Sequence, residues 1–445
     1  MRKKLFLFTY FISLILLGSI LLVLPIAWNG DGRLSFLDAV FTATSAVCVT
    51  GLITVQTADY SILGKIVILL LIQFGGLGII SFTTIYLAVP ARKISLKRRN
   101  EVQEYYLSSV ETDPKKIIKQ IVVFTVIIEI IGTVLLAKPF SANVKHGLIF
   151  VSLFHSVSAF CNAGFSLFKN SLEDYTDVLQ VNITVMLLII FGGLGFVVLQ
   201  DAKRKIFGEN RRLTLHTKIV LLMTGTLIIF GALFFYIFEH NTSLKGLSQG
   251  GKILASFFQS VTTRTAGFDS VSQNSLSVPS KVLTLPLMFV GGSSGSIAWG
   301  VKVTTFFIII IVTLHGTDSK GEVKLFNQKI SAENLSRAQN FAIKAIIILF
   351  ASIFLLTITE LHHFGRNAAF QEGKEFLSIV FESFSAFGTV GLSLGLTPNL
   401  SPAGKIVIMM TMFAGRVGLI SIAMPRIQKY SEYLVDYPRG EVLIG

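Results

Sequence analysis

Eight long apolar segments constrain the fold of this chain more than any other feature of its sequence. They comprise residues 5–27, 63–90, 120–137, 181–199, 219–238, 282–314, 340–359 and 405–425. Each is close to the roughly 20 residues that a helix needs to cross a bilayer core. Charged residues make up only 14% of the chain, against about 25% in soluble domains. The sequence therefore predicts an all-α polytopic membrane protein.

The first apolar segment follows Arg2, Lys3 and Lys4, as the apolar region of a cleavable signal peptide would. It continues too far for a signal peptide, and no Ala-x-Ala-like cleavage site follows it. We therefore expect the first spanning helix here.

Positive charge gathers on alternate loops. If the N-terminus lies on one side of the membrane, the loops on that side contain 25 of the 39 Lys and Arg residues. These loops are residues 1–4, 91–119, 201–218, 315–344 and 425–445. The positive-inside rule then predicts a multi-pass protein with both termini in the cytoplasm. Topology explains the net charge of +14 without nucleic acid as a partner, and attraction of anionic membrane lipid is a secondary role.

One twelve-residue pattern occurs four times along the chain. Each copy begins with Phe and reaches a Gly ten residues later, followed by Leu or Phe. The copies are FTATSAVCVTGL (41–52), FHSVSAFCNAGF (154–165), FFQSVTTRTAGF (257–268) and FESFSAFGTVGL (381–392). Such self-similarity at corresponding positions is the signature of an internal repeat.

A second glycine follows each pattern, 24 residues after the first glycine in three copies and 28 in the second copy. These second glycines are Gly75, Gly192, Gly291 and Gly415. Ten residues before three of them stands a lysine, at Lys65, Lys281 and Lys405. We expect these lysines to be interfacial anchors at the outer ends of their helices.

A short segment of about 12 to 15 residues precedes each first glycine and is too short to span the membrane. The four segments are roughly residues 36–47, 146–160, 248–262 and 375–386. A chain that turns back at membrane depth needs a cavity or surrounding protein for its irregular backbone. The sequence therefore predicts four pseudo-repeated helix–pore loop–helix units around one central pore, with eight spanning helices and four re-entrant pore helices.

Rings of backbone carbonyls can replace the water of a cation in a narrow pore. Glycine permits the positive-φ conformations that such a ring needs, and the C-terminal ends of the short helices favour a cation there. A glycine after a helix is more often a simple cap, but four copies in register favour a filter. The predicted filter residues are Val49, Thr50, Gly51, Asn162, Ala163, Gly164, Thr265, Ala266, Gly267, Thr389, Val390 and Gly391.

The four-fold frame resembles the Trk/Ktr/HKT superfamily of potassium-translocating proteins over essentially the whole chain. The segments VTTRTAGF (261–268), GGSSGS (291–296) and YPRGEVLIG (437–445) are most similar to the KtrB membrane subunits of bacterial Ktr systems. The resemblance implies a potassium uptake subunit in a bacterial plasma membrane. It also implies a homodimer with one pore per protomer and a cytosolic KtrA-type ring that binds nucleotide and gates the pore.

The resemblance also implies a role for sodium, since transport by family members is often stimulated by sodium. In the plant branch a Ser at the first filter position accompanies sodium transport, whereas this chain has Gly51 there. The pattern favours potassium. A Na⁺-permeable or Na⁺/K⁺ cotransporting protein of the same fold is the alternative.

A predicted gate interrupts the third unit at residues 291–300. In the family the equivalent stretch is a loop inside the membrane beneath the filter, and a kink at close-packed glycines is the alternative. The predicted gate residues are Gly291, Gly292, Ser293, Ser294, Gly295, Ser296 and Arg416. Arg416 takes the place of a glycine in the other repeats. It is predicted either as an electrostatic barrier or as a structural partner of the loop's carbonyls.

For four other polar or cysteine residues the sequence predicts a structural role. We expect Arg264 to point behind the filter, onto Glu382 or Asp269. Glu129 is a candidate partner of Arg416 or Lys302, and a proton-coupled role is its less favoured alternative. Cys48 and Cys161 occupy equivalent positions and are predicted to be packing residues without a disulfide.

The units divide the chain into repeats joined by cytoplasmic loops. The predicted boundaries are repeat 1 at 1–90, a loop at 91–119, repeat 2 at 120–200, a loop at 201–218, repeat 3 at 219–314, a loop at 315–339, repeat 4 at 340–425 and a tail at 426–445. The loops and the tail are candidate docking surfaces for the cytosolic partner.

Two other classes of function fit less well. Secondary transporters also use broken helices, but their repeats are typically two and often inverted. An enzyme is not predicted, because the sequence has no HExxH motif, nucleophile elbow or clustered intramembrane Asp and His. No P-loop is present, so nucleotide would act through a partner. No covalently bound cofactor is expected.

Overall fold

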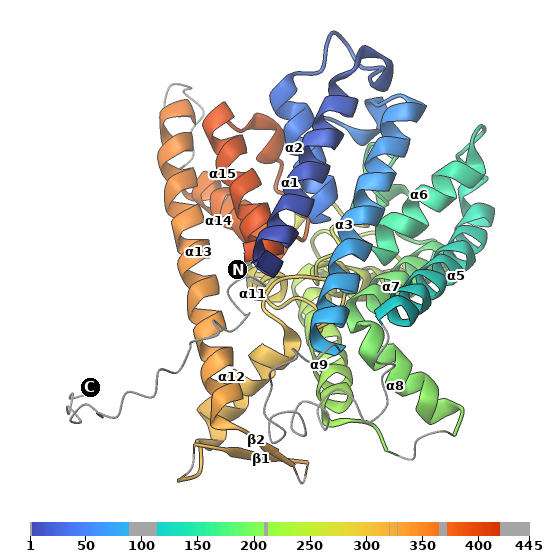
Figure 1. The fold of residues 1–445 in the computed structure, drawn as a ribbon. Coiled ribbons are helices and arrows are strands. Elements are labelled where there is room, and N and C mark those ends of the chain that lie inside the picture. Colours follow the sequence, from blue (N-terminus) through green and yellow to red (C-terminus); the bar gives the residue numbers. More distant parts are fainter. Residues whose placement is uncertain are drawn as a thin grey trace.

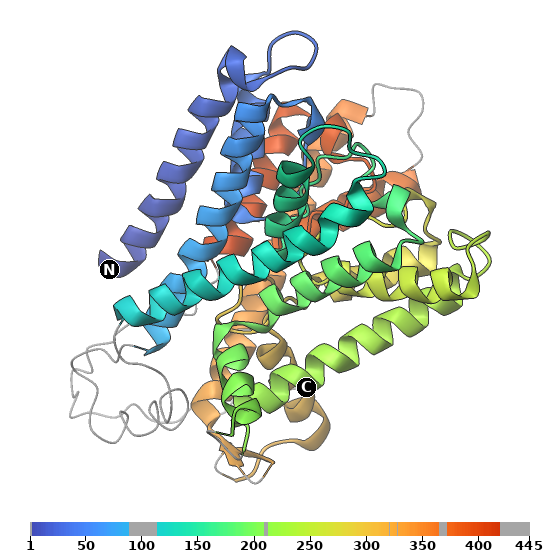
Figure 2. The same ribbon diagram turned by 90° about the vertical axis from the view of Figure 1, so that its right-hand side faces the viewer.

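The computed structural model describes residues 2–88, 114–208, 212–319, 321–326, 328–364 and 372–418. Helices make up most of this part of the chain, and the longest of them flank a set of short central helices (Figures 1 and 2). The predicted loop 91–119 and the C-terminal tail lie largely outside the described residues.

The same order of elements occurs in each quarter of the chain: a long helix, a short helix, a 3₁₀ turn and a further helix. The first two quarters contain α1 (Arg2–Val23), α2 (Phe36–Cys48), α3 (Ile62–Ala88), α5 (Pro114–Phe140), α6 (Leu148–Phe160), α7 (Leu179–Leu194) and α8 (Phe196–Ile206). The last two contain α9 (Leu215–Glu239), α10 (Gln249–Thr262), α11 (Val278–Phe289), α12 (Val303–His315), α13 (Ala332–Phe364), α14 (Glu372–Gly388) and α15 (Pro402–Phe413). The 3₁₀ turns are Thr57–Asp59, Glu173–Tyr175, Gln273–Ser275 and Thr397–Asn399.

Hydroxyl side chains fix where several of these helices begin. Ser35, Ser248 and Ser401 each accept a hydrogen bond from the backbone N–H three residues later, at the starts of α2, α10 and α15. Such N-caps satisfy a backbone donor that the first helical turn leaves open. The local sequence therefore determines where the short helices α2 and α10 and the later helix α15 begin.

Three described helices are long and apolar enough to cross a membrane: Lys115–Phe140, Leu215–Glu239 and Ala332–Glu360. A fourth span results if the bent pair α7 and α8 is counted as one. Other described apolar helices are shorter than this length test requires, among them the described parts of α1 and α3. The eight predicted spans therefore remain a prediction.

Two predicted spans are broken. The apolar segment 181–199 is not one straight helix, because α7 ends at Leu194 and the chain turns by 102° into α8. Gly195 makes the turn with a φ of 86°, a backbone conformation that glycine adopts easily. The segment 282–314 is interrupted between α11 and α12, where the sequence predicts the gate.

The helices leave apolar side chains on the outside of the molecule. Leu16, Leu17 and Ile20 of α1 are exposed, as are Ile347, Phe350 and Phe354 of α13. In contrast, nearly every residue from Phe41 to Cys48 of α2 is buried, including its Ser and Thr residues. Apolar outside and polar buried centre is the arrangement of a protein surrounded by lipid.

A small hairpin follows α12. Strands β1 (Val323–Leu325) and β2 (Gln328–Ile330) pair antiparallel, with Val323 opposite Ile330. Both side chains pack with Leu335 at the start of α13. In Figure 1 the hairpin and α8 lie at the same lower end of the molecule.

Candidate functional site

The four first glycines form a closed ring. A Cβ added to Gly51 would overlap the carbonyl oxygen of Ala163 and lie 3.2 Å from the Cα of Gly164. The same relation links Gly164 to Gly267, Gly267 to Gly391, and Gly391 back to Gly51, with 3.0, 3.0 and 3.1 Å to the next Cα. Segments more than 100 residues apart in sequence thus meet at one place, and no side chain fits between them.

The backbone has an unusual conformation at the same position of every copy. The residue two before each glycine has a positive φ, and these residues are Val49 (55°), Asn162 (56°), Thr265 (68°) and Thr389 (49°). They are four of the six non-glycine residues with positive φ in the described chain. A β-branched residue rarely adopts this conformation, and such strain concentrates at functional sites.

Hydroxyl groups at the ends of the short helices hold this backbone in place. The Ser45 hydroxyl accepts a hydrogen bond from the Gly51 N–H at 3.1 Å, and the Ser385 hydroxyl accepts one from Gly391 at 3.0 Å. The hydroxyls of Ser158 and Thr262 donate to the carbonyls of Phe165 and Phe268. The sequence prediction missed these residues, although a Ser at the fifth position of three copies was the available signal.

The second glycines allow the following helix to touch the short helix of the same quarter. A Cβ at Gly75, Gly192 or Gly415 would overlap the carbonyl oxygen of Val47, Phe160 or Phe387 respectively. Each of these carbonyls lies four residues before the first glycine of its copy. The glycine spacing that defines the repeat therefore corresponds to a backbone-to-backbone contact in three quarters.

In the third quarter the second glycine opens a loop instead. Residues 290–301 form a loop closed at its base, where Gly291 N–H donates to Val301 O and Val301 N–H donates to Phe289 O, both at 3.0 Å. Its residues are buried apart from Ser294, which is half-buried. We call residues 290–301 the intramembrane loop; it contains all six predicted gate residues of this segment.

The intramembrane loop is bound to the end of α7. Ser293 N–H donates to Gly193 O at 3.0 Å, and Ile297 N–H donates to Gly192 O at 3.2 Å. The Ser293 hydroxyl donates to Leu194 O. Phe196 N–H, the first of α8, donates to Gly295 O at 3.3 Å.

On its other side the loop contacts Arg416, which is 1% exposed. The guanidinium donates to Ile297 O at 2.7 Å and to Gly75 O at 3.2 Å. It thereby links the intramembrane loop to α3. Arg416 lies in a π-helical turn, Ala414–Gly418, which follows α15; such bulges are frequent at functional sites.

Trp299 lies close to two cations. Its ring has Lys302 Nζ at 4.6 Å from its centroid and Arg416 Cζ at 5.2 Å. Lys302 also donates to Ala298 O at 2.7 Å. Cation–π attraction is strongest for tryptophan and increases when the pair is desolvated. The sequence prediction missed this role of Trp299, because the three residues meet only through the folded loop.

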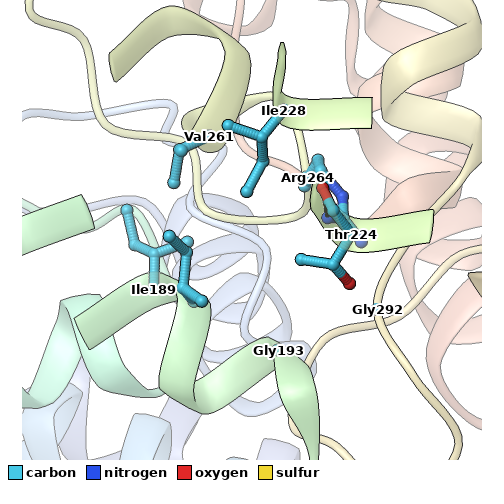
Figure 3. Close-up of a pocket in the computed structure, with 8 residues that line it drawn as sticks. Ile189, Gly193, Thr224, Ile228, Val261, Arg264 and Gly292 are labelled. Atoms are coloured by element: carbon cyan, nitrogen blue, oxygen red, sulfur yellow. Dashed lines mark hydrogen bonds between the residues drawn. The ribbon is translucent and has the colours of Figure 1, made fainter. Parts of the chain in front are cut away.

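Arg264 does not contact its predicted partners, and its place behind the filter stays a prediction. It donates to Gly291 O at 3.1 Å and to Thr224 O at 3.4 Å rather than to the carboxylates of Glu382 or Asp269. It lines a cavity of about 20 Å³ with Thr224, Ile228 and Val261 (Figure 3), about enough for one water molecule. Arg264 thus binds the Gly291 carbonyl just after the end of α11 and the Thr224 carbonyl in α9.

Three further predictions can be compared with the structure. Glu129 accepts a hydrogen bond from Gln73 at 3.1 Å, so its predicted pairing with Arg416 or Lys302 is wrong. Cys48 and Cys161 are buried and free, as predicted. Lys405 forms an ion pair with Asp38 at 2.7 Å and is therefore more than an interfacial anchor.

Comparison with known proteins places this geometry in a family. A family model described as TrkH, cation transport protein, matches residues 7–435. In structure the chain is similar to the crystal structure of the potassium transporter TrkH from Vibrio parahaemolyticus. The TM-score is 0.70 at 18% identity, over 93% of this chain and 84% of that one. This likeness shows a polytopic membrane fold.

Curated relatives are similar along nearly their whole length. The chain is 39% identical to the Ktr system potassium uptake protein B of Bacillus subtilis, over 98% of this chain and 95% of the relative. It is 37% identical to the potassium/sodium uptake protein NtpJ of Enterococcus hirae, over 98% and 95%. These matches and the family model lead to one conclusion: the chain belongs to the TrkH family of cation transport proteins.

Proposed function

We propose that this protein is the ion-translocating membrane subunit of a potassium uptake system. Potassium passes through a four-part filter made of the backbone carbonyls of residues 49–51, 162–164, 265–267 and 389–391. The closed ring of glycines is the single observation that carries this proposal, since it brings four carbonyl-bearing segments together where no side chain fits. The short helices α2, α6, α10 and α14 are the pore helices of this arrangement.

The chemistry of the ring suits a cation without its water. The carbonyls of Thr50, Ala163, Ala266 and Val390 are the groups that the glycines approach. Carbonyl oxygens replace the hydration shell of potassium in known filters. The buried hydroxyls of Thr50 and Thr389 have no hydrogen-bond partner in the described residues, so they are free to contribute.

In this proposal the intramembrane loop is the gate, and Arg416, which binds the loop at Ile297 O, adds a positive charge to it. A buried cation close to the ion path raises the electrostatic barrier for potassium. The chain acts as a homodimer with both termini in the cytoplasm, and a cytosolic KtrA-type nucleotide-binding subunit controls the loop. The names of the Ktr relatives support such a two-subunit system.

A second candidate function is uptake of sodium together with potassium. The relative from Enterococcus hirae, 37% identical, is named a potassium/sodium uptake protein. The two candidates share the same ring and differ in ion preference.

Flux measurements on the purified chain in liposomes test the proposal, with imposed K⁺ and Na⁺ gradients. The informative variant is Gly391→Ser. Gly391 has a φ of 98°, and its new Cβ would overlap Thr50 O. We expect the wild type to prefer potassium and the variant to lose roughly tenfold of that preference, about 1.4 kcal/mol, because the new Cβ displaces the Thr50 carbonyl from the ring.

The matched control is Gly246→Ser. Gly246 has a φ of 100° but open space around its Cβ, so it carries the same backbone strain without the contact. The control should keep the wild-type preference. Equal sodium and potassium flux in the wild type would favour the second candidate. No cation flux even with a KtrA-type subunit would refute the pore.

A further inference from the structure

Helix α8 combines features that the proposed pore does not use. It follows the 102° turn after α7, so it runs across the direction of its neighbour rather than continuing it. One face is buried through Phe196, Val198 and Asp201. At the far end of α8 both charged and apolar side chains are exposed. If α7 spans the membrane, a turn of 102° directs α8 along the membrane surface.

The far end of α8 has the composition of a lipid-binding surface. Lys203 and Lys205 are exposed, and Ile206 and the following Phe207 are 78% and 71% exposed. Lys203 Nζ lies 6.0 Å from the centroid of the Phe207 ring, so cation and aromatic ring are adjacent. Lysines beside large apolar side chains are typical of helices at the interface of an anionic bilayer. A free phosphate would leave Ile206 and Phe207 without a role.

The near end of α8 is bound to the intramembrane loop. Phe196 N–H donates to Gly295 O at 3.3 Å. At the turn itself, a Cβ on Gly195 would lie 2.7 Å from Ser293 Oγ and 3.1 Å from Gly295 O. The start of α8 is therefore in direct backbone contact with the loop at Gly295, and the Ser293 hydroxyl lies beside the turn.

The middle of α8 is held against α9. Asp201 Oδ2 accepts hydrogen bonds from the Thr214 N–H at 3.0 Å and the Thr214 hydroxyl at 2.9 Å. Val198 packs with Ile219 and Val220 of α9. With these contacts α8 connects the intramembrane loop at one end with the basic, apolar surface at the other.

We propose that anionic phospholipid of the inner leaflet binds α8 at Lys203 and Lys205, with Ile206 and Phe207 inserted beside the headgroups, and thereby sets the position of the intramembrane loop. Ion flux then depends on the anionic lipid content of the membrane. This inference rests on the proposed gate and on the proposed cytoplasmic side of α8. It assigns to lipid a surface that the sequence left among the docking surfaces of the cytosolic subunit.

The test compares Lys203→Gln/Lys205→Gln with the wild type in vesicles of phosphatidylcholine alone and of an equal mixture with phosphatidylglycerol. Binding of spin-labelled phosphatidylglycerol is measured first, because it does not depend on flux. Each lysine close to an anionic surface contributes about 1 kcal/mol, so we expect about fivefold weaker binding per lysine removed. Potassium flux is measured in the same vesicles, where we expect a several-fold lipid dependence in the wild type and none in the variant.

The control is Lys324→Gln/Lys329→Gln, which removes two exposed lysines from the β hairpin at the same end of the molecule. It should keep both lipid binding and lipid-dependent flux. Equal lipid binding by all three proteins would overturn the inference. So would a lipid-independent wild-type flux that the α8 variant alters only when the cytosolic subunit is added, since α8 would then be a protein-docking surface. Normal lipid binding by α8 with no flux in any protein would instead refute the proposed pore.

Discussion

At the scale of single residues, three cations around the intramembrane loop have backbone carbonyls as partners, and no ion pair joins them to a carboxylate in the described residues. Arg264, Arg416 and Lys302 all donate to carbonyl oxygens, and the last two also lie close to the Trp299 ring. In the proposed pore, the lack of a carboxylate at this site avoids a fixed negative charge that would bind the transported cation. The carbonyl dipoles still compensate part of the desolvation.

Trp299 should keep the intramembrane loop in place. We expect Trp299→Leu to raise potassium leak through liposomes in the absence of the cytosolic subunit, because the loop loses both cation–π contacts, each worth roughly 0.5–2 kcal/mol. Trp299→Phe keeps a ring face and is the matched control. If potassium leak through the Leu variant were no greater than through the Phe variant, the Trp299 ring would contribute only its volume.

At the scale of elements, the four quarters share one order of helices but use their second glycine differently. Gly75 continues within α3, Gly192 lies just before the break after α7, Gly291 opens the intramembrane loop, and Gly415 lies in a π-helical turn. The short helices are more uniform, and each is followed by a residue with positive φ two positions before its glycine. The quarters therefore vary mainly in their second helices.

The hydroxyl at the end of a short helix should support the filter conformation. We expect Ser385→Ala in α14 to lower the K⁺/Na⁺ preference in the liposome assay, since the Gly391 N–H loses a hydrogen bond worth about 0.5–1.5 kcal/mol. Ser383→Ala is the control on the same helix. Ser383 is buried, and its hydroxyl has no partner among the described residues. Equal effects of the two changes would contradict the proposed support.

At the scale of the whole molecule, the first and last quarters must meet for the ring to close. The ion pair between Asp38 of α2 and Lys405 of α15 joins them, with side chains only about 16% and 15% exposed. One hydrophobic cluster contains Phe41 from the first quarter with Leu356 and Ile408 from the fourth. The first and last quarters are thus joined by one ion pair and by one apolar cluster.

Lys405→Met should weaken this closure. We expect a loss of stability between the ~1 kcal/mol of an exposed ion pair and the ~3 kcal/mol of a buried one, measured as a lower melting temperature in detergent. Lys65→Met is the control, because Lys65 holds the equivalent place in the first quarter and makes no ion pair among the described residues. A melting temperature equal to that of the control would show that the ion pair is dispensable.

The sequence predicted the parts of this molecule that depend on local pattern. Apolar length predicted the long helices, and the spacing of Gly51, Gly164, Gly267 and Gly391 predicted the residues that meet in the ring. It did not predict contacts made across the fold, such as that of Arg416 with Gly75, 341 residues apart. The direction of α8 was also missed, because Gly192, Gly193 and Gly195 in the apolar segment do not by themselves specify a 102° turn.

The closed ring has a genetic consequence, since all of its members belong to one polypeptide. In a channel assembled from four identical chains, any codon change is copied into every position around the axis. Here a codon change alters one position and leaves the other three as they were. The residues two before the glycines are accordingly no longer all alike: Val49 and Asn162 stand beside two threonines, Thr265 and Thr389. Such a ring can be altered one position at a time, and a gene of this kind can acquire graded ion preference in small steps.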